Sequence, residues 1–354
     1  MKKINIIKES EDVIIVATLD DIAKELGIFL EGDRSITGAE LDKMTEEELD
    51  AQVERISVYA RVSPENKIRI VDAWQKKGKI VAMTGDGVND APALRKADVG
   101  FAMGSGTEAA KEAGKIVILD DNFKSIKDAI WYGRTIYHNI LKFCKFQLVI
   151  NVTAVIVSAL SPFLGVEEPL KVTHLLFVNL VMDSLGAIML GNEPALKEYL
   201  SEPPRRRDES IVSRKMMTQI VIMGLWLTLV SFAYLKLDVF VNLFVTEEQH
   251  LTGYFVLFIV AALFNGFNVR DERFGIFKGL NENPNFIKVM LAIMAIQFVI
   301  VNAAIIPLAP FEWIGNMFSC TPFGIMGWIA VVLLAVTMIP VDCIRKVFMT
   351  KAAK

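Results

Sequence analysis

Two aspartates in the string Thr84-Gly-Asp-Gly-Val-Asn-Asp-Ala-Pro-Ala-Leu94 could bind a divalent metal ion. They are Asp86 and Asp90, which follow an apolar run at 80–83 that is suited to a buried parallel strand. The glycines on either side of Asp86 permit a sharp turn after the strand. In open α/β sheets, ligands bind beyond the carboxyl ends of the strands, where these aspartates are expected. Two carboxylates there suit Mg²⁺, which usually binds through one or two carboxylates plus phosphate oxygens.

The same string also has a purely structural interpretation. A Gly-Asp-Gly sequence on its own could be a turn that binds nothing. Asn89 or Asp90 could cap the helix expected through Ala91–Leu94, with Pro92 in its first turn.

A second group of polar residues lies in apolar surroundings nearer the C-terminus. Asn179 and Asp183 are spaced i, i+4, so we expect them to share one face of a helix. An aspartate at membrane depth normally faces a bundle interior or a cavity. One carboxylate and one amide oxygen suit a cation that prefers oxygen ligands, and Asn151 on the preceding span could add a second amide oxygen. Alternatively, Asn151 could form only interhelical hydrogen bonds, and Asp183 could be structural.

Composition divides the elements that carry these residues into two parts. The 354 residues are 53% hydrophobic, but charged and mixed sequence fills residues 1–124, where strands and helices alternate. This alternation predicts a doubly wound α/β sheet. Residues 125–354 predict an all-α bundle, which begins with a continuous helix over 123–160, half stalk and half membrane. Six stretches are long and apolar enough to span a bilayer: 141–160, 170–191, 215–236, 252–268, 286–308 and 325–344.

Charge predicts the partners and the orientation. The net charge of −3 favours no nucleic-acid partner and leaves the lipid bilayer as the expected one. Basic residues gather at alternate ends of the spans, which predicts that these loops, the α/β domain and both termini face the cytoplasm. The basic residues are Arg205, Arg206, Arg207, Arg214, Lys215, Arg270, Arg273, Lys278, Arg345, Lys346, Lys351 and Lys354, and the opposite loops carry Glu167, Glu168, Glu247, Glu248 and Glu312.

The string from Thr84 to Leu94 resembles the hinge motif of P-type ATPases, whose phosphorylation domain is haloacid-dehalogenase-like. The resemblance implies that Asp86 and Asp90 bind the catalytic Mg²⁺. Through the match Ala60-Arg-Val-Ser-Pro-Glu-Asn-Lys67, it also implies that Lys67 touches the phosphate on a catalytic aspartate, although most lysines are only surface residues. The remaining residues expected to contact the cofactor are Thr84, Gly85, Gly87 and Asn89.

The membrane part resembles that of calcium-transporting P-type ATPases. The string Phe177-Val-Asn-Leu-Val-Met-Asp-Ser-Leu-Gly-Ala187, followed by Asn192-Glu-Pro194, is similar to their sixth span, and the other five spans resemble the fifth and the seventh to tenth. The resemblance implies Ca²⁺ as the transported ion, with Mn²⁺ as an alternative. At three positions where members of this family carry residues that bind the cation, this sequence has Ala154, Met182 and Ala262. These departures imply a single cation site, as in plasma-membrane-type pumps.

Several family motifs do not occur in this sequence. It contains neither the Asp-Lys-Thr-Gly-Thr string of the phosphorylated aspartate nor the Thr-Gly-Glu-Ser string of the actuator domain. A nucleotide-binding domain and the fourth span are also missing. The resemblance therefore implies the C-terminal part of a pump, in which ATP acts only with the missing N-terminal half. We expect the chain to be inactive alone.

Two other functions stay open at this stage. A membrane-anchored phosphatase would need a nucleophilic aspartate early in the chain, and Asp20 and Asp21 are the nearest candidates. A non-catalytic membrane protein could instead regulate a complete pump by pairing with its spans. The simple loops and the start without a signal-peptide pattern fit a bacterial plasma membrane.

Overall fold

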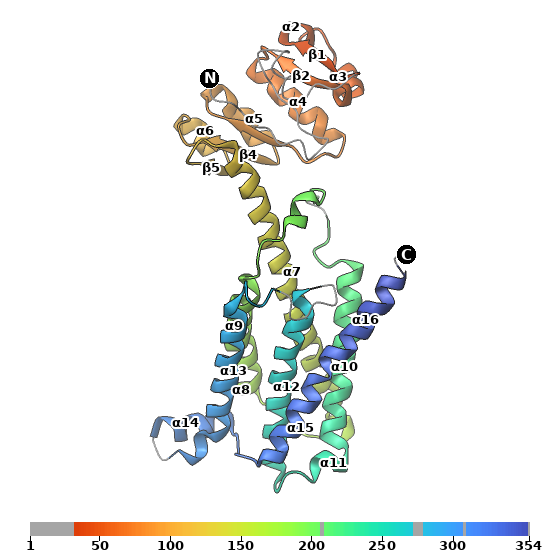
Figure 1. Cartoon of the computed structure of the whole chain (residues 1–354), viewed down its shortest axis with the longest axis vertical. Coiled ribbons are helices and arrows are strands. Elements are labelled where there is room, and N and C mark those ends of the chain that lie inside the picture. Colours follow the sequence, from red (N-terminus) through yellow and green to blue (C-terminus); the bar gives the residue numbers. More distant parts are fainter. Residues whose placement is uncertain (1–31, 206–208, 272–278, 307–308, 353–354) are drawn as a thin grey trace. The chain divides into compact units, whose positions relative to one another are not determined.

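The computed structural model describes residues 32–205, 209–271, 279–306 and 309–352, which are drawn in colour in Figure 1. The chain forms two compact units. The first holds the described residues up to Arg134 together with Leu196–Glu209, and the second holds Thr135–Ala195 and Ser210–Lys354. Some residues singled out in the sequence lie outside the described ranges: Asp20, Asp21, Arg206, Arg207, Arg273, Lys278 and Lys354.

The first unit begins with a two-stranded parallel sheet covered by three helices. The strands are β1 (Arg34–Thr37) and β2 (Ile56–Ala60), and the helices are α2 (Gly38–Leu41), α3 (Glu46–Gln52) and α4 (Pro64–Lys76). Their buried side chains form a small core of Ile36, Leu41, Leu49, Val53, Ile56, Tyr59, Ile70 and Ala73. This core holds α4, the helix that carries Lys67, against the sheet.

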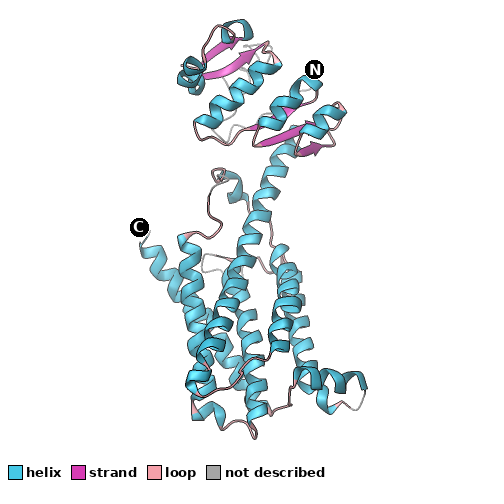
Figure 2. Cartoon of the chain, turned by 180° about the vertical axis from the view of Figure 1, so that it is seen from behind, coloured by secondary structure: helices cyan, strands magenta, loops and turns pink. Residues whose placement is uncertain are grey.

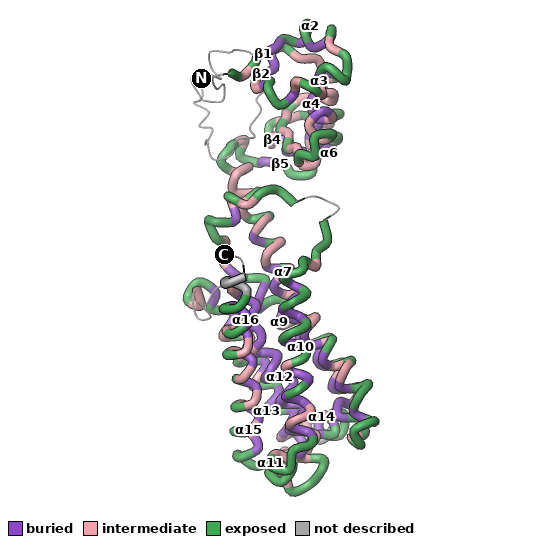
Figure 3. The backbone as a smooth tube through the Cα atoms, turned by 90° about the vertical axis from the view of Figure 1, so that its right-hand side faces the viewer, coloured by how far each residue is buried: buried purple, intermediate pink, exposed green. Residues whose placement is uncertain are grey.

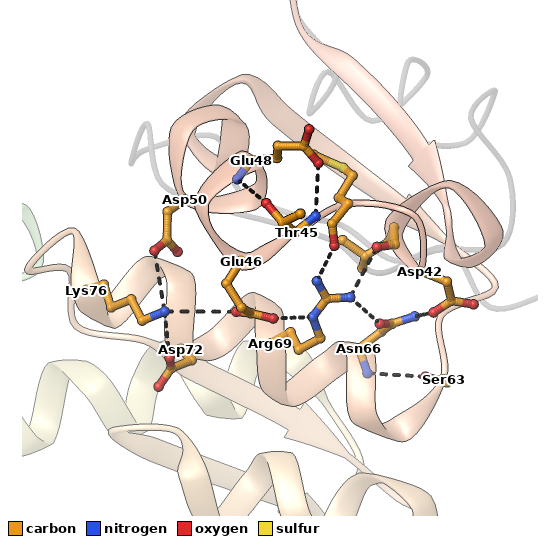
Figure 4. Close-up of polar contacts among 12 residues, drawn as sticks. Asp42, Thr45, Glu46, Glu48, Asp50, Ser63, Asn66, Arg69, Asp72 and Lys76 are labelled. Atoms are coloured by element: carbon orange, nitrogen blue, oxygen red, sulfur yellow. Dashed lines mark hydrogen bonds and ion pairs between the residues drawn. The ribbon is translucent and has the colours of Figure 1, made fainter.

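Polar contacts also hold the start of α4 in place (Figure 4). Arg69 donates from Nε to Glu46 over 2.6 Å and from its terminal nitrogens to two main-chain carbonyls between the end of α2 and the start of α3. Asn66 donates to Asp42 over 2.7 Å, and Ser63 caps the helix by accepting from the Asn66 amide. The turn of α4 that presents Lys67 is therefore held on several sides.

A second parallel sheet carries the predicted metal-binding loop. Its strands are β3 (Ala82–Gly85), β4 (Val99–Met103) and β5 (Ile116–Ile118), in that order, with helices α5 (Ala91–Lys96) and α6 (Glu108–Ala113). Within the described residues the five strands form two short parallel sheets, and the single doubly wound sheet that was predicted is not seen there. The prediction of a buried strand at 80–83 was wrong. Ala82 and Thr84 are exposed, because β3 pairs with β4 on one side and with no described strand on the other.

Helix α7 (Phe123–Leu160) is continuous over 38 residues, as predicted. At 1.5 Å per residue it is about 57 Å long, nearly twice the hydrocarbon thickness of a bilayer. The division between the two units falls within it, between Arg134 and Thr135. The predicted boundary at 124/125 stays a prediction about domains.

Six helical segments in the described residues are long and apolar enough to cross a membrane, which confirms the six predicted spans (Figure 2). They are Phe123–Leu160, Val172–Gly191, Arg214–Lys236, Glu247–Arg270, Pro284–Ile305 and Ile325–Phe348. The second comprises α8 (Val172–Leu176), a π-helical segment (Phe177–Met182) and α9 (Asp183–Gly191). The others contain α10 (Arg214–Lys236), α12 (Glu247–Arg270), α13 (Pro284–Asn302), α15 (Ile325–Val336) and α16 (Met338–Ala352), and the connections hold α11 (Asp238–Val241) and α14 (Ala309–Phe318).

Helix α12 is the centre of the membrane unit. Its apolar window is 94% buried, and Figure 3 shows it as a nearly continuous buried segment among its neighbours. A helix that is apolar all round is expected in a core. Small residues allow close approach: a Cβ added to Gly253 would lie 2.2 Å from the Tyr234 hydroxyl, and one added to Gly266 would lie 3.0 Å from Met189. The remaining spans, including α7 and α9, pack around this helix and leave part of their surface exposed.

Candidate functional site

The loop after β3 brings Lys67 and Asp90 together. Lys67 Nζ lies 2.5 Å from Asp90 Oδ1, and the main-chain amides of Asp86 and Gly87 donate to Asp90 Oδ2 over 3.2 and 3.1 Å. Both carboxylate oxygens therefore have partners. Asp90 occupies the N-cap position of α5 but makes no side-chain bond to that helix, and Asn89 is exposed. The expected capping role was wrong, because the carboxylate turns back to close its own loop.

Close packing explains the glycines of the loop. A Cβ on Gly85 would lie 2.5 Å from the Asp90 Cβ, so only glycine fits there. Gly87 is less restricted, because its added Cβ would come no closer than 3.5 Å to Asp90. The next loop also supports the site: the Thr107 amide donates to the Asp86 carbonyl over 2.8 Å, and a Cβ on Gly106 would lie 2.9 Å from that carbonyl.

Electrostatics keep Asp90 charged. Burial alone would raise the pKa of its carboxyl, but the hydrogen bond and charge of Lys67, together with the two loop amides, outweigh burial and lower that pKa. The Asp86 carboxylate is exposed and accepts no hydrogen bond from the described part of the chain. The exposed Thr84 hydroxyl lies 3.4 Å from the Met103 sulfur. The loop thus offers one anchored and one open carboxylate.

This donor set fits Mg²⁺. Asp86 and Asp90 are hard oxygen donors in one loop, which is the number of carboxylates that Mg²⁺ usually takes from a protein. No group of three or more His, Cys, Asp or Glu residues that could hold a metal occurs in the described ranges. Water or phosphate oxygens would have to supply the remaining ligands.

The membrane unit places Asp183 in its interior. The residue is 6% exposed and follows directly on the π-helical segment. Its Oδ2 accepts a 2.8 Å hydrogen bond from Gln147 Nε2 on α7, while its Oδ1 is buried and has no partner among the described residues. An unpaired carboxylate oxygen in an apolar interior is costly unless a cation or a proton occupies it. This orphaned atom points to ligand binding more directly than the sequence did.

The expected partner residues of Asp183 differ from it in burial. Asn179 is exposed whereas Asp183 is buried. Residues four apart lie about one turn from each other in an α-helix and in the π-helical segment alike, so the prediction that the two share one face stays a prediction. Asn151 is half-buried on α7, one turn beyond Gln147 and on the same face.

The sequence analysis missed a buried ion cluster centred on Glu193, which is 7% exposed. Its Oε1 accepts from Arg270 Nε and from Asn283 Nδ2, each over 2.7 Å, and Lys142 Nζ lies 3.6 Å from Oε2. Asn139 donates to the Glu193 carbonyl over 3.1 Å. The signal was present: Lys142 is a charge inside an apolar span, and Arg270 and Glu193 end their helical patterns.

Some basic residues assigned to loops are in fact buried. Arg270 belongs to the Glu193 cluster, and Lys346 on α16 forms a 2.8 Å ion pair with Asp342. Lys346 also donates to the Asp271 carbonyl over 2.7 Å, just past the end of α12. These side chains therefore tie helix ends together instead of projecting from loops.

Comparison with known proteins bears on both units. A family model described as the C-terminus of cation-transporting ATPases matches residues 167–348, and two models of haloacid dehalogenase-like hydrolases match residues 13–98 and 68–130. The chain belongs to the cation-transporting ATPase family. This membership confirms the family predicted from the sequence, and the hydrolase matches confirm the fold class of the first unit.

Individual members of the ATPase family are similar over most of the chain. Calcium-transporting ATPase 1 of Lactococcus lactis is 40% identical over 321 residues, 90% of this chain and 35% of that protein. A calcium-transporting ATPase of Listeria monocytogenes is 39% identical over 95% of this chain and 37% of that protein. A plasma-membrane-type calcium-transporting ATPase of Arabidopsis thaliana is 38% identical over 81% of this chain and 28% of that protein. The chain thus spans about a third of the length of these relatives.

Proposed function

We propose that the chain is the C-terminal part of an ATP-driven calcium transporter, in which Asp183 binds the transported ion and the loop at 84–90 binds Mg²⁺. The observation that carries the proposal is the buried Oδ1 of Asp183, which has no partner among the described residues. A dehydrated Ca²⁺ needs such hard oxygens. The names of the calcium-transporting relatives support Ca²⁺ as the cargo, and Mn²⁺ is the competing ion.

The α/β unit would act on the phosphorylated group. Lys67 holds its charge beside Asp90 and can stabilise phosphoryl oxygens as negative charge develops on them. Mg²⁺, when bound by Asp86 and Asp90, would neutralise further phosphate charge. Arg69 and Asn66 keep the turn of α4 in place, so Lys67 needs little rearrangement to reach its partner.

The chain alone is proposed to be inactive. A pump of this type passes through an aspartyl-phosphate, and the printed sequence contains no Asp-Lys-Thr-Gly-Thr string to form one. We infer that the chain works with a polypeptide segment that carries this nucleophile, the nucleotide domain and further spans. Asp183 and Asn151 would then contribute half of the cation site, and that segment would supply the other half. The segment would also cover the exposed Asn179.

We propose the orientation and the membrane on charge and on the relatives. The positive-inside rule places the basic ends of the spans, the α/β unit and both termini in the cytoplasm. A bacterial plasma membrane is proposed because two of the similar proteins are bacterial, although others come from plants. Labelling of single cysteines introduced at Glu167 and Glu202 from either side of sealed vesicles tests the orientation.

Two measurements test the function. The native coding DNA upstream of Met1 should encode a segment with the phosphorylation string, and the complete product should take up ⁴⁵Ca²⁺ with ATP. Asp183→Asn should abolish uptake, whereas Glu167→Gln, an exposed charge in the same unit, should not. Uptake that survives Asp183→Asn would refute the assignment of the site.

Measurements on the printed chain alone distinguish the pump fragment from the phosphatase and from the regulator. Reconstituted alone, it should neither hydrolyse ATP nor release phosphate from p-nitrophenyl phosphate. Phosphatase activity that disappears in Asp20→Asn or Asp21→Asn would establish the membrane-anchored phosphatase instead. Co-purification with an independent, complete pump, with no related upstream DNA, would establish a regulator.

A further inference from the structure

Gln147 is the one side chain in the described ranges that donates a hydrogen bond to Asp183, and no role follows for it from the proposed function. It lies half-buried on α7, in the interior half of the bundle, and its Nε2 donates to Asp183 Oδ2 over 2.8 Å. The two residues are 36 positions apart in the sequence. The bond therefore links α7 to the beginning of α9.

This hydrogen bond leaves Oδ1 open to a cation, but a cation that binds both oxygens of the carboxylate would compete with it. The amide nitrogen presents a positive hydrogen to Asp183, and a divalent ion at the same carboxylate would repel it. The opposite end of the same amide carries an oxygen, Oε1, that accepts no hydrogen bond from the described residues. Oxygen is the ligand atom that such a cation prefers.

Exchange of the two ends requires only a small motion. The terminal torsion of glutamine is broad and roughly two-fold, so a half-turn of the amide swaps nitrogen and oxygen with little change in shape. Asn151 lies one turn further along the same face of α7 and would bring a second amide oxygen to the same side.

We propose that Gln147 is a ligand of the transported divalent cation, which turns its amide from hydrogen-bond donor to Asp183 into oxygen ligand when the cation binds. The inference rests on the proposed role of Asp183 as a cation ligand. Without the cation, Gln147 holds Oδ2 in place and leaves Oδ1 open. With the cation, Oε1 joins the carboxylate, and this compensates for the lost hydrogen bond.

Equilibrium binding of ⁴⁵Ca²⁺ to the complete product in lipid nanodiscs, from 0.01 to 10 mM, tests the inference without requiring transport. Gln147→Leu removes donor and acceptor and should weaken binding roughly 10- to 100-fold, the usual loss for a residue that ligates or orients a metal ligand. Gln147→Glu keeps an oxygen but no donor. It should bind at least as tightly as the complete product without substitutions, whereas a purely structural donor would make this variant as weak as Gln147→Leu.

The control is Gln219→Leu, the same substitution at a buried glutamine of α10 that makes no bond to Asp183. It should leave binding unchanged, and helical circular dichroism of every variant checks folding. If Asp183→Asn abolishes binding while Gln147→Leu does not, or if Gln147→Glu binds as weakly as Gln147→Leu, the inference is wrong and the proposed function stands. If Asp183→Asn leaves binding unchanged, or the complete product without substitutions binds no Ca²⁺ up to 10 mM, both fail.

Discussion

Removing the charge of Glu193 should destabilise the membrane unit strongly. In Glu193→Gln, Arg270 and Lys142 lose the carboxylate that lies 2.7 and 3.6 Å from them, and both remain buried. The new amide oxygen can still accept from Arg270 and Asn283, so the loss is the negative charge between two buried cations and the contact with Lys142. A hydrogen bond to a charged group contributes about 1.5–3 kcal/mol, and breaking a buried ion pair costs about 3–5 kcal/mol. We therefore expect the free energy of unfolding to fall by about 3–5 kcal/mol.

A double-mutant cycle separates this effect from general damage. Arg270→Gln alone leaves Glu193 paired with Lys142, and the combination with Glu193→Gln restores the original net charge of the cluster. The two costs should therefore be less than additive, by about 1.5 kcal/mol or more. Arg270 also lies over the Phe286 ring, 4.7 Å from its centroid, so its own substitution is not free of cost.

The assay is reversible unfolding of the chain in mixed micelles with rising dodecyl sulfate, followed by circular dichroism. Glu167→Gln, at an exposed glutamate in the connection after α7, serves as the control and should change stability by no more than about 0.5 kcal/mol. A cost below about 1 kcal/mol for Glu193→Gln would refute the reasoning. So would strict additivity in the cycle, because independent residues cannot form the cluster described.

Three further predictions concern the candidate sites. Gly85→Ala should lower the free energy needed to open the 84–94 loop by about 1–3 kcal/mol, because its Cβ would overlap the Asp90 Cβ, whereas Gly87→Ala should leave that free energy unchanged. Local hydrogen exchange measures the opening in both variants. Equal protection of the two loops would contradict the packing. The lowered pKa of Asp90 means that its stabilising contribution is present above the unfolded pKa near 4 and is lost as pH falls through the folded pKa. Lys67→Met should raise the pKa of Asp90, so loop protection should be lost at a higher pH than in the original chain, and an unchanged profile would count against the ion pair. Asp183→Asn should change the unfolding free energy of the membrane unit by less than about 1 kcal/mol, since the new amide oxygen can still accept from Gln147 and the cost of burying an unpaired charge is removed. A loss as large as that of Glu193→Gln would mark Asp183 as structural.

Local sequence was sufficient to predict the helices and strands, but not how deeply each of them would be buried. Strand β4 and helix α6 have local signals, because glycines and a capping threonine at 104–107 separate them. The burial of β3 could not be predicted, since it depends on whether another strand lies beside it. Span positions were predictable for a similar reason: about 20 apolar residues are needed to cross a bilayer, wherever the helix later packs.

The candidate sites show the same division. The glycines and carboxylates around Asp86 were recognisable because their contacts are made within a few residues. The pairing of Gln147 with Asp183 crosses 36 residues, and that of Asn283 with Glu193 crosses 90, so no local pattern reports either. The exposure of Asn179 could not be predicted either, since it depends on which elements pack beside the segment at 177–182.

In the membrane unit, the donors around Glu193 and Asp183 distinguish a structural role from a binding role. Both oxygens of Glu193 lie against cationic or amide donors that come from three other elements, so a cation has no open position there. Asp183 has one oxygen held by a neutral amide and the other without a described partner, so a cation could bind without displacing a charged group. The first arrangement ties helices together at the end of the bundle, and the second keeps a site open within it. Buried charge alone would have marked both residues as functional, whereas the count of donors at each oxygen separates them.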